Sequence, residues 1–100
     1  MFLSNTDKEL ISKLKGRISR ALNVQTSLSR EERACMEGLY NTIDEVILGN
    51  AKYNETGVLK ETLMGYSTSL KNSKRKFIKE HIIPLVTKIA TKKWRTKWAK

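Results

Sequence analysis

Residues 71–100 read KNSKRKFIKEHIIPLVTKIATKKWRTKWAK, and the rest of the chain is organised around this stretch. It holds eleven of the twenty lysines and arginines and one acid, Glu80, whereas residues 1–70 hold nine basic and nine acidic groups. The formal net charge of +10 is therefore the charge of the C-terminal third. A segment that is basic on one side and apolar on the other packs one face inward and turns the other outward. The apolar residues are Phe77, Ile78, Ile82, Leu85, Val86, Ile89, Trp94 and Trp98.

The composition is that of a folded domain without strands. Hydrophobic residues make up 39% and charged residues 30% of the 100 residues, which fits a globular domain with a modest core and not a disordered tail. There is one proline, the five glycines are isolated, and no segment alternates apolar and polar residues over a useful length. We therefore predict an all-α fold. One domain spans residues 1–100, with a basic, tryptophan-containing tail at about 92–100.

A first helix is predicted over residues 7–23. Thr6 and Glu9 have the spacing of a capping box, in which each side chain accepts a hydrogen bond from the other residue's backbone N–H. Asn23 tolerates the left-handed geometry that ends many helices. The apolar residues recur at helical spacing on one face and are Leu10, Ile11, Leu14, Ile18, Ala21 and Leu22.

A second helix is predicted over residues 30–48. Ser29 and Glu32 have the spacing of another capping box, and Gly49 followed by Asn50 is a stop signal. The connection that follows is short, so the third helix should be an antiparallel neighbour. The predicted apolar face consists of Cys35, Met36, Leu39, Tyr40, Ile43, Val46 and Ile47.

A third helix is predicted to begin at Asn54 or Thr56, which compete as N-caps, and to end near residues 72–75. Gly65 lies inside it at a cost of about 1 kcal/mol relative to alanine, and we expect it to let a neighbouring helix come close. The apolar stripe of this helix is Val58, Leu59, Leu63, Tyr66 and Leu70.

Pro84 leaves two alternatives for the fourth helix. Proline has no N–H to donate to the carbonyl of Glu80, and its ring crowds that carbonyl. The helix is therefore either kinked, running from about 76 to 97, or it begins at Pro84 after an extended connection over residues 81–83. The uninterrupted stripe favours the kinked helix, and its members are Ile78, Ile82, Leu85 and Ile89.

Four amphipathic helices with short connections predict an antiparallel four-helix bundle. No helix has enough apolar surface to be stable alone, because burying one Leu or Ile contributes only about 1.5–3 kcal/mol. We expect the stripes to meet in one core that buries Leu14, Ile18, Leu39, Ile43, Leu63, Leu70, Ile82 and Ile89.

The sequence contains no catalytic or metal-binding constellation. Cys35 and His81 are the only cysteine and histidine, which excludes a disulfide within the chain and a Cys/His metal cluster. Cys35 lies on an apolar stripe, where a buried, inert thiol is expected. We predict that the protein is not an enzyme and needs no cofactor. The absence of a secretory signal or of an apolar run near the ~20 residues of a membrane span predicts a cytoplasmic location.

The candidate partner-binding residues lie in the C-terminal third. Trp94 and Trp98 are four residues apart, so a helix would place both on one face. In one interpretation they fold back and cap the core. In the other they form an aromatic–basic tip, because Trp and Arg often dominate binding surfaces and Trp suits a membrane interface. The candidate set is Lys79, Lys88, Lys92, Lys93, Trp94, Arg95, Lys97 and Trp98.

Three local segments invite comparison with a known family: Ser29-Arg30-Glu31-Glu32, Leu48-Gly49-Asn50-Ala51-Lys52-Tyr53 and Lys71-Asn72-Ser73-Lys74. Together with size, basic character and helix layout over about residues 7–92, they resemble the immunity proteins against class IIa (pediocin-like) bacteriocins, close to the enterocin A immunity type. Ile82-Ile83-Pro84 is also similar to a segment of at least one member. The tail from Trp94 to Lys100 is not a feature of the family at large.

The resemblance implies an interaction protein that protects a bacteriocin producer from inside. Such proteins stay in the cytosol, associate loosely with the membrane, and are thought to bind the sugar phosphotransferase permease with its bound bacteriocin. In the family, the C-terminal half is held to select the bacteriocin that is countered. An anionic membrane surface would add weak adhesion, at about 1 kcal/mol for each nearby Lys or Arg.

Two other functions remain open from the residues alone. A basic face would also bind nucleic acid through its phosphates, although the sequence has no recognisable base-reading motif. A phage or toxin inhibitor that acts by protein contact is the other alternative.

Overall fold

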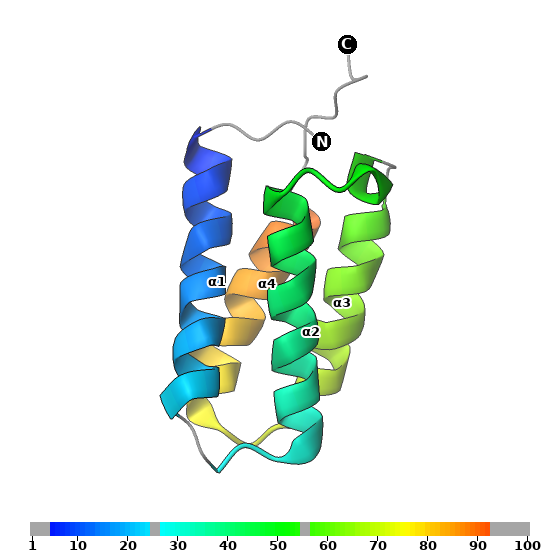
Figure 1. Cartoon of the computed structure of the whole chain (residues 1–100). Helices are drawn as coiled ribbons and strands as arrows, with labels where there is room; N and C mark the ends of the chain where they lie inside the picture. The colour runs from blue at the N-terminus through cyan, green and yellow to red at the C-terminus, as the bar shows by residue number, and fades with distance from the viewer. Residues whose placement is uncertain (1–4, 25–26, 55–56, 93–100) are drawn as a thin grey trace.

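The computed structural model describes residues 5–24, 27–54 and 57–92, and within these ranges it contains helices and no strand. The four helices are α1 (Asn5–Val24), α2 (Arg30–Ile47), α3 (Val58–Leu70) and α4 (Ile83–Thr91). A 3₁₀ turn, η1 (Ala51–Asn54), precedes α3, and a π-helical stretch, η2 (Ile78–Ile82), leads into α4. Figure 1 shows α1 and α3 running in one direction and α2 and α4 in the other. The predicted antiparallel four-helix bundle is confirmed.

The helices form a ring in which each contacts the next. α1 packs against α2, α2 against α3 and α3 against α4, and α4 with η2 returns to α1. Two pairs are therefore diagonal, α1 with α3 and α2 with α4. The eight residues predicted to be buried all are, each exposing at most 1% of its surface. The core also takes in residues from every helix, among them Ile11, Met36, Val46, Leu59, Ile78, Leu85, Val86 and Ala90.

Two apolar predictions need correction. Ile47 was assigned to the buried face of α2, but it is 41% exposed because it lies at the last residue of the helix. Tyr53, which follows α2, adds a further buried residue to the core, and its hydroxyl donates to Glu45 at 3.1 Å. Cys35, predicted to be a buried thiol, is only half-buried and packs at the edge of the core.

The start of α2 is as predicted. Ser29 Oγ accepts from the Glu32 N–H at 3.1 Å, and Glu32 Oε1 accepts from the Ser29 N–H at 2.8 Å. Gly49, with φ of +80°, ends the segment in left-handed geometry that glycine adopts without strain. The boundaries of α1 differ from the prediction, because the helix already includes Thr6 and continues past Asn23. The proposed cap at Thr6 and the left-handed residue at Asn23 are therefore wrong.

The start of α3 also differs from the prediction. Its N-cap is Gly57, with φ of +88°, and not Asn54 or Thr56. The helix ends at Leu70, a few residues before the predicted break.

A close helix approach occurs at a glycine, but not at the predicted one. A β-carbon at Gly65 would meet nothing within 4 Å, and this residue is exposed. A β-carbon at Gly38 on α2 would lie 2.5 Å from ring atoms of Tyr66 on α3. Gly38 is therefore the position where the absence of a side chain lets α2 and α3 pack.

The chain is helical without a break through Pro84. Ile82 and Ile83 have helical dihedral angles, so the predicted extended connection over residues 81–83 is wrong. The Ile83 N–H donates to the Ile78 carbonyl, five residues back, and this wider π-helical turn lies directly before the proline. We attribute the π turn to the proline, whose ring would clash with a carbonyl of a regular α-turn. The helix ends at Thr91, because Lys92 is extended, and so it stops short of the predicted residue 97.

Candidate functional site

The outward side of the fourth helical stretch is basic. Lys76, Lys79 and Lys88 are exposed, and none of them makes an ion pair with another residue in the described ranges. In a regular α-helix Lys79 would share a stripe with the buried Val86 and Ala90, seven and eleven residues later. The wider turn of η2 rotates Lys79 away from this stripe and into solvent. The π turn therefore adds a lysine to the exposed surface.

The structure describes three of the eight candidate residues. Lys79 and Lys88 are exposed, as expected, whereas Lys92 forms an ion pair at 3.1 Å with Asp7 at the start of α1. This pair ties the end of α4 to the first turn of α1. The remaining candidates lie outside the described residues and are Lys93, Trp94, Arg95, Lys97 and Trp98.

α1 extends the basic side. Arg17 Nη1 donates to the backbone carbonyl of His81 at 2.9 Å, which places the guanidinium against the π-helical turn. Lys13 is one turn before Arg17 and shares its face of α1, next to α4. On α4, Lys88 is one turn before Lys92, which bonds Asp7 of α1. Arg17 therefore lies against the π-helical turn, and Lys13 and Lys88 are each one turn from a residue that joins α1 to the fourth helical stretch.

Charge is divided between opposite sides of the bundle. α2 carries five acidic and two basic residues, whereas residues 76–92 carry four lysines and one acid. α1 carries five basic and two acidic residues. Because α2 and α4 are diagonal in the ring, the acidic helix lies opposite the basic one. The described part of the molecule therefore has a basic side, formed by α4 and the adjoining face of α1.

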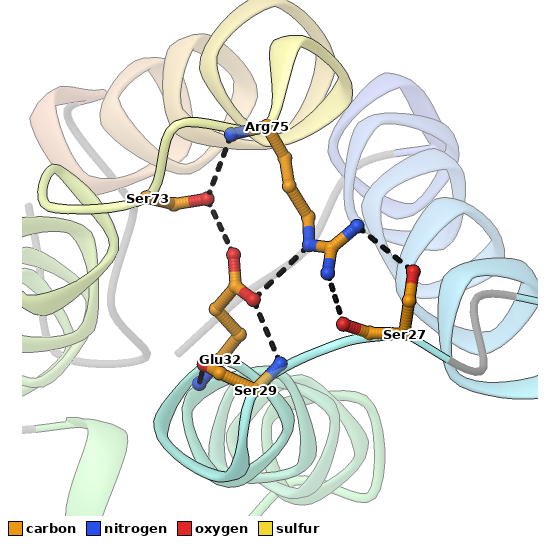
Figure 2. A network of polar contacts seen from close by, with 5 residues as sticks. All are labelled: Ser27, Ser29, Glu32, Ser73 and Arg75. Carbon is orange, nitrogen blue, oxygen red and sulfur yellow. Dashed lines mark hydrogen bonds and ion pairs between the residues drawn. The ribbon is translucent and has the colours of Figure 1, made fainter.

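One basic residue of the C-terminal third is not part of this surface. Figure 2 shows that Arg75, just before the fourth helical stretch, points into a polar network with Glu32 at the start of α2. Arg75 Nε donates to Glu32 Oε1 at 3.0 Å, and its Nη1 and Nη2 donate to the hydroxyl and carbonyl of Ser27. Ser73 donates to the other Glu32 oxygen and accepts from the Arg75 N–H. The network joins the α1–α2 and α3–α4 connections at one end of the bundle.

The network determines the protonation state of Glu32. Burial alone would raise the pKa of its carboxyl, because the charged form is desolvated. Hydrogen bonds from Ser73, from the Ser29 N–H and from Arg75 outweigh that effect and lower the pKa to about 2. The carboxylate thus stays ionised, accepts hydrogen bonds from three residues of the chain, and holds the two connections together.

A hollow of about 620 Å³ lies beside this network, between the start of α2 and the end of α3. Cys35 reaches it from α2, and Lys74 lines it from the α3–α4 connection. Its polar groups include Glu32 and Ser73, which already bond each other. In the described ranges no group of three or more His, Cys, Asp or Glu side chains is arranged to hold a metal ion.

Comparisons with family models, with curated proteins and with solved structures all give no match. None of the described helices combines the length and apolar character that would let it cross a membrane.

Sequence reasoning found the exposed lysines but missed the contacts that connect distant segments. Arg75 and Glu32 are 43 residues apart, and no local pattern indicates that they meet. The same holds for Arg17 and the carbonyl of His81, which are 64 residues apart. The capping box at Ser29 gave one signal. It uses one oxygen of the Glu32 carboxylate, and the second oxygen is then available to accept from a distant donor.

Proposed function

We propose that this protein is a class IIa bacteriocin immunity protein. It protects the cell from inside by binding the toxin-engaged sugar phosphotransferase permease at the membrane. The observation that carries the proposal is the basic side of the bundle, formed by α4 and the adjoining face of α1 opposite the acidic α2. A protein with this charge division is attracted to the anionic inner leaflet in one orientation.

The exposed lysines are suited to encounter and orientation. Exposed charges change association rates more than final affinity, and near an anionic leaflet each contributes about 1 kcal/mol. Lys79 and Lys88 belong to the predicted partner-binding set and lie on this side. They would bring the bundle to the membrane with the C-terminal third facing the receptor.

The family resemblance is supported by a structural role for its residues. Ser29, Glu32 and Ser73, from two of the three similar segments, bond one another in the network of Figure 2. Gly49 and Tyr53, from the third segment, form the turn after α2 and its buried anchor. These residues support the helix layout, whereas recognition is assigned to the basic side.

The test is protection of a sensitive strain. A strain killed by class IIa bacteriocins is made to express the protein, and the inhibitory concentration is measured across a panel of these toxins. We expect resistance to at least one toxin, and loss of that resistance in the variant Lys79→Glu/Lys88→Glu. A variant with the same charge change elsewhere, Lys8→Glu/Arg30→Glu on α1 and α2, should still protect.

The outcomes separate the proposal from its alternatives. Sensitivity to every class IIa toxin, with the protein present at normal levels, would reject immunity. An equal loss of resistance in both charge-reversal variants would show that protection depends on the net charge of the protein and not on the basic side. Tight, salt-resistant binding of the purified protein to one DNA sequence would favour the nucleic-acid alternative.

A further inference from the structure

Two contacts define a seam between α1 and the fourth helical stretch. Arg17 Nη1 donates to the His81 carbonyl at 2.9 Å, and Lys92 forms an ion pair at 3.1 Å with Asp7. α1 and α4 run in opposite directions and pack against each other, so the chain between Asp7 and Arg17 lies beside the chain between His81 and Lys92 (Figure 1). We call this stretch the α1/α4 seam.

Two exposed lysines lie along the seam. Lys13 is one turn before Arg17 on α1, and it therefore falls on the face that the Arg17 contact turns toward α4. Lys88 is one turn before Lys92 and in the same way falls on the side of α4 next to α1. Neither lysine forms an ion pair with another residue in the described ranges. The seam therefore carries positive charge that its own neighbours leave uncompensated.

Acids are scarce in the seam. Residues 82–91 contain none, and residues 8–16 contain Glu9 alone. Glu9 is exposed and makes no ion pair within the part of the chain that the structure describes. Lys13, Lys88 and Arg17 thus exceed the acidic groups of the seam by two charges.

Arg17 is oriented but not neutralised. It is half-buried, and the acceptor that holds its guanidinium is a backbone carbonyl, which carries no full charge. Arg75, by contrast, bonds the carboxylate of Glu32. A guanidinium has five N–H donors in a planar fork, so most of those of Arg17 remain available. Such a fork matches the oxygens of a phosphate group, to which it donates two parallel hydrogen bonds.

The seam is suited to a single headgroup at a membrane surface. A protein that tracks duplex DNA makes about six to ten phosphate contacts, more than three basic groups supply. The acidic α2 lies opposite α4, so an anionic surface at the seam meets no repulsion from it. We propose that the α1/α4 seam binds the phosphodiester of an acidic phospholipid, with Arg17 on the phosphate and Lys13 and Lys88 beside it. This inference deepens the proposed function and rests on it for placing this side of the bundle at the membrane.

The first test separates phosphate recognition from general attraction. The full chain is titrated at constant salt with vesicles of phosphatidylglycerol and phosphatidylcholine, and the bound fraction is measured by sedimentation. Arg17→Lys keeps the charge but loses the planar fork, and it should bind roughly tenfold more weakly. Arg30→Lys makes the same change at an exposed arginine of α2 and should bind as the wild type does. Wild-type affinity in Arg17→Lys, or the same loss in both variants, would overturn the proposal.

A second pair of variants leaves the Arg17 contact in place. Lys13→Gln/Lys88→Gln removes two exposed charges that bond no described residue, and it should weaken vesicle binding roughly twentyfold. Lys8→Gln/Arg30→Gln removes as much charge away from the seam and should weaken binding far less. Equal losses in the two double variants would show that only net charge attracts the protein, which contradicts a site at the seam.

The third test identifies the source of the phosphate. The Nε–H signal of Arg17 is followed by NMR while soluble dihexanoylphosphatidylglycerol or inorganic phosphate is added, and Arg17→Lys assigns the signal. The lipid should shift this signal, and inorganic phosphate at the same concentration should not. Saturation by inorganic phosphate at a lower concentration would make the ligand a free phosphate. Tighter binding of a DNA duplex than of vesicles at equal salt would make it a nucleic acid. Either result would overturn the lipid assignment.

These measurements contain no bacteriocin and no permease, so the two proposals fail separately. Weaker vesicle binding by Arg17→Lys, in a protein that protects against no class IIa toxin, would reject immunity and retain the seam. Protection by the wild type, with Arg17→Lys bound to vesicles as tightly as the wild type, would reject the seam and retain immunity.

Discussion

Glu32 illustrates what a single residue contributes when its partners come from distant segments. Its capping role toward Ser29 is local and follows from the sequence, because the two are three residues apart. Its bonds to Ser73 and Arg75 depend on how the two connections meet, and no sequence spacing predicts them. Arg75 adds to the net charge of the C-terminal third, but the structure uses it to compensate the half-buried Glu32 carboxylate.

We predict that Glu32 makes the free energy of unfolding fall as the pH is lowered into the acid range. The folded pKa of about 2 lies below the ordinary value of 4.5, so the stabilisation is fully present above pH 4.5 and is lost as the pH falls toward 2. This shift corresponds to roughly 3 kcal/mol at neutral pH. Glu32→Gln should therefore lower the free energy of unfolding at neutral pH and flatten its decline between pH 4.5 and 2, as measured by urea denaturation at several pH values.

The neighbouring carboxylate supplies the control. Glu31 is exposed on the same helical turn, and Glu31→Gln should leave both the unfolding free energy and its pH profile nearly unchanged. A Glu32→Gln profile parallel to that of the wild type through this window would show that the network contributes no ionic stabilisation.

At the scale of the helices, hydrophobic periodicity predicted the buried faces correctly because it depends only on 3.6 residues per turn. It could not place the close approach of α2 and α3. Whether a glycine is needed depends on which side chain faces it, and Tyr66 faces Gly38 while Gly65 faces solvent. Nor could it foresee the π turn before Pro84, because an unbroken apolar stripe is compatible with a regular helix.

The two helical glycines should respond to alanine with opposite signs. Gly65→Ala should raise the free energy of unfolding by about 0.5–1 kcal/mol, because alanine favours the helix and meets no neighbour. Gly38→Ala should lower it by about 1 kcal/mol, because overpacking against Tyr66 exceeds the gain in helix propensity. Chemical denaturation of the two variants checks both values.

Tyr66 provides the control for this comparison. In a Tyr66→Leu background the ring atoms that would meet the new β-carbon are gone, so Gly38→Ala should then become neutral or stabilising. If Gly38→Ala lowered the free energy of unfolding equally with Tyr66 and with Leu at position 66, the strain would lie elsewhere in α2.

For the whole molecule, the division of charge depends on the topology as well as on the sequence. The sequence places the positive charge in the last third, but only the ring order of the helices puts the acidic α2 opposite α4. Lys88 could be predicted as a surface residue because it falls between apolar positions, whereas the exposure of Lys79 depends on the π turn. The exposure of Ile47 could not be predicted, because this residue continues the apolar stripe of α2 to the last residue of the helix.

In the proposed function, Trp94 and Trp98 set how long the basic side stays bound to its partner. Lysines on this side set the encounter, whereas truncating a central Trp in an interface costs about 2 kcal/mol or more and shortens the lifetime of the complex. If Trp94 and Trp98 face the partner, Trp94→Ala/Trp98→Ala should leave helical content and melting temperature nearly unchanged. Protection in the bacteriocin assay should fall sharply. A large drop in melting temperature would instead mean that the tryptophans cap the core, and full protection with both replaced would assign recognition to the helices alone.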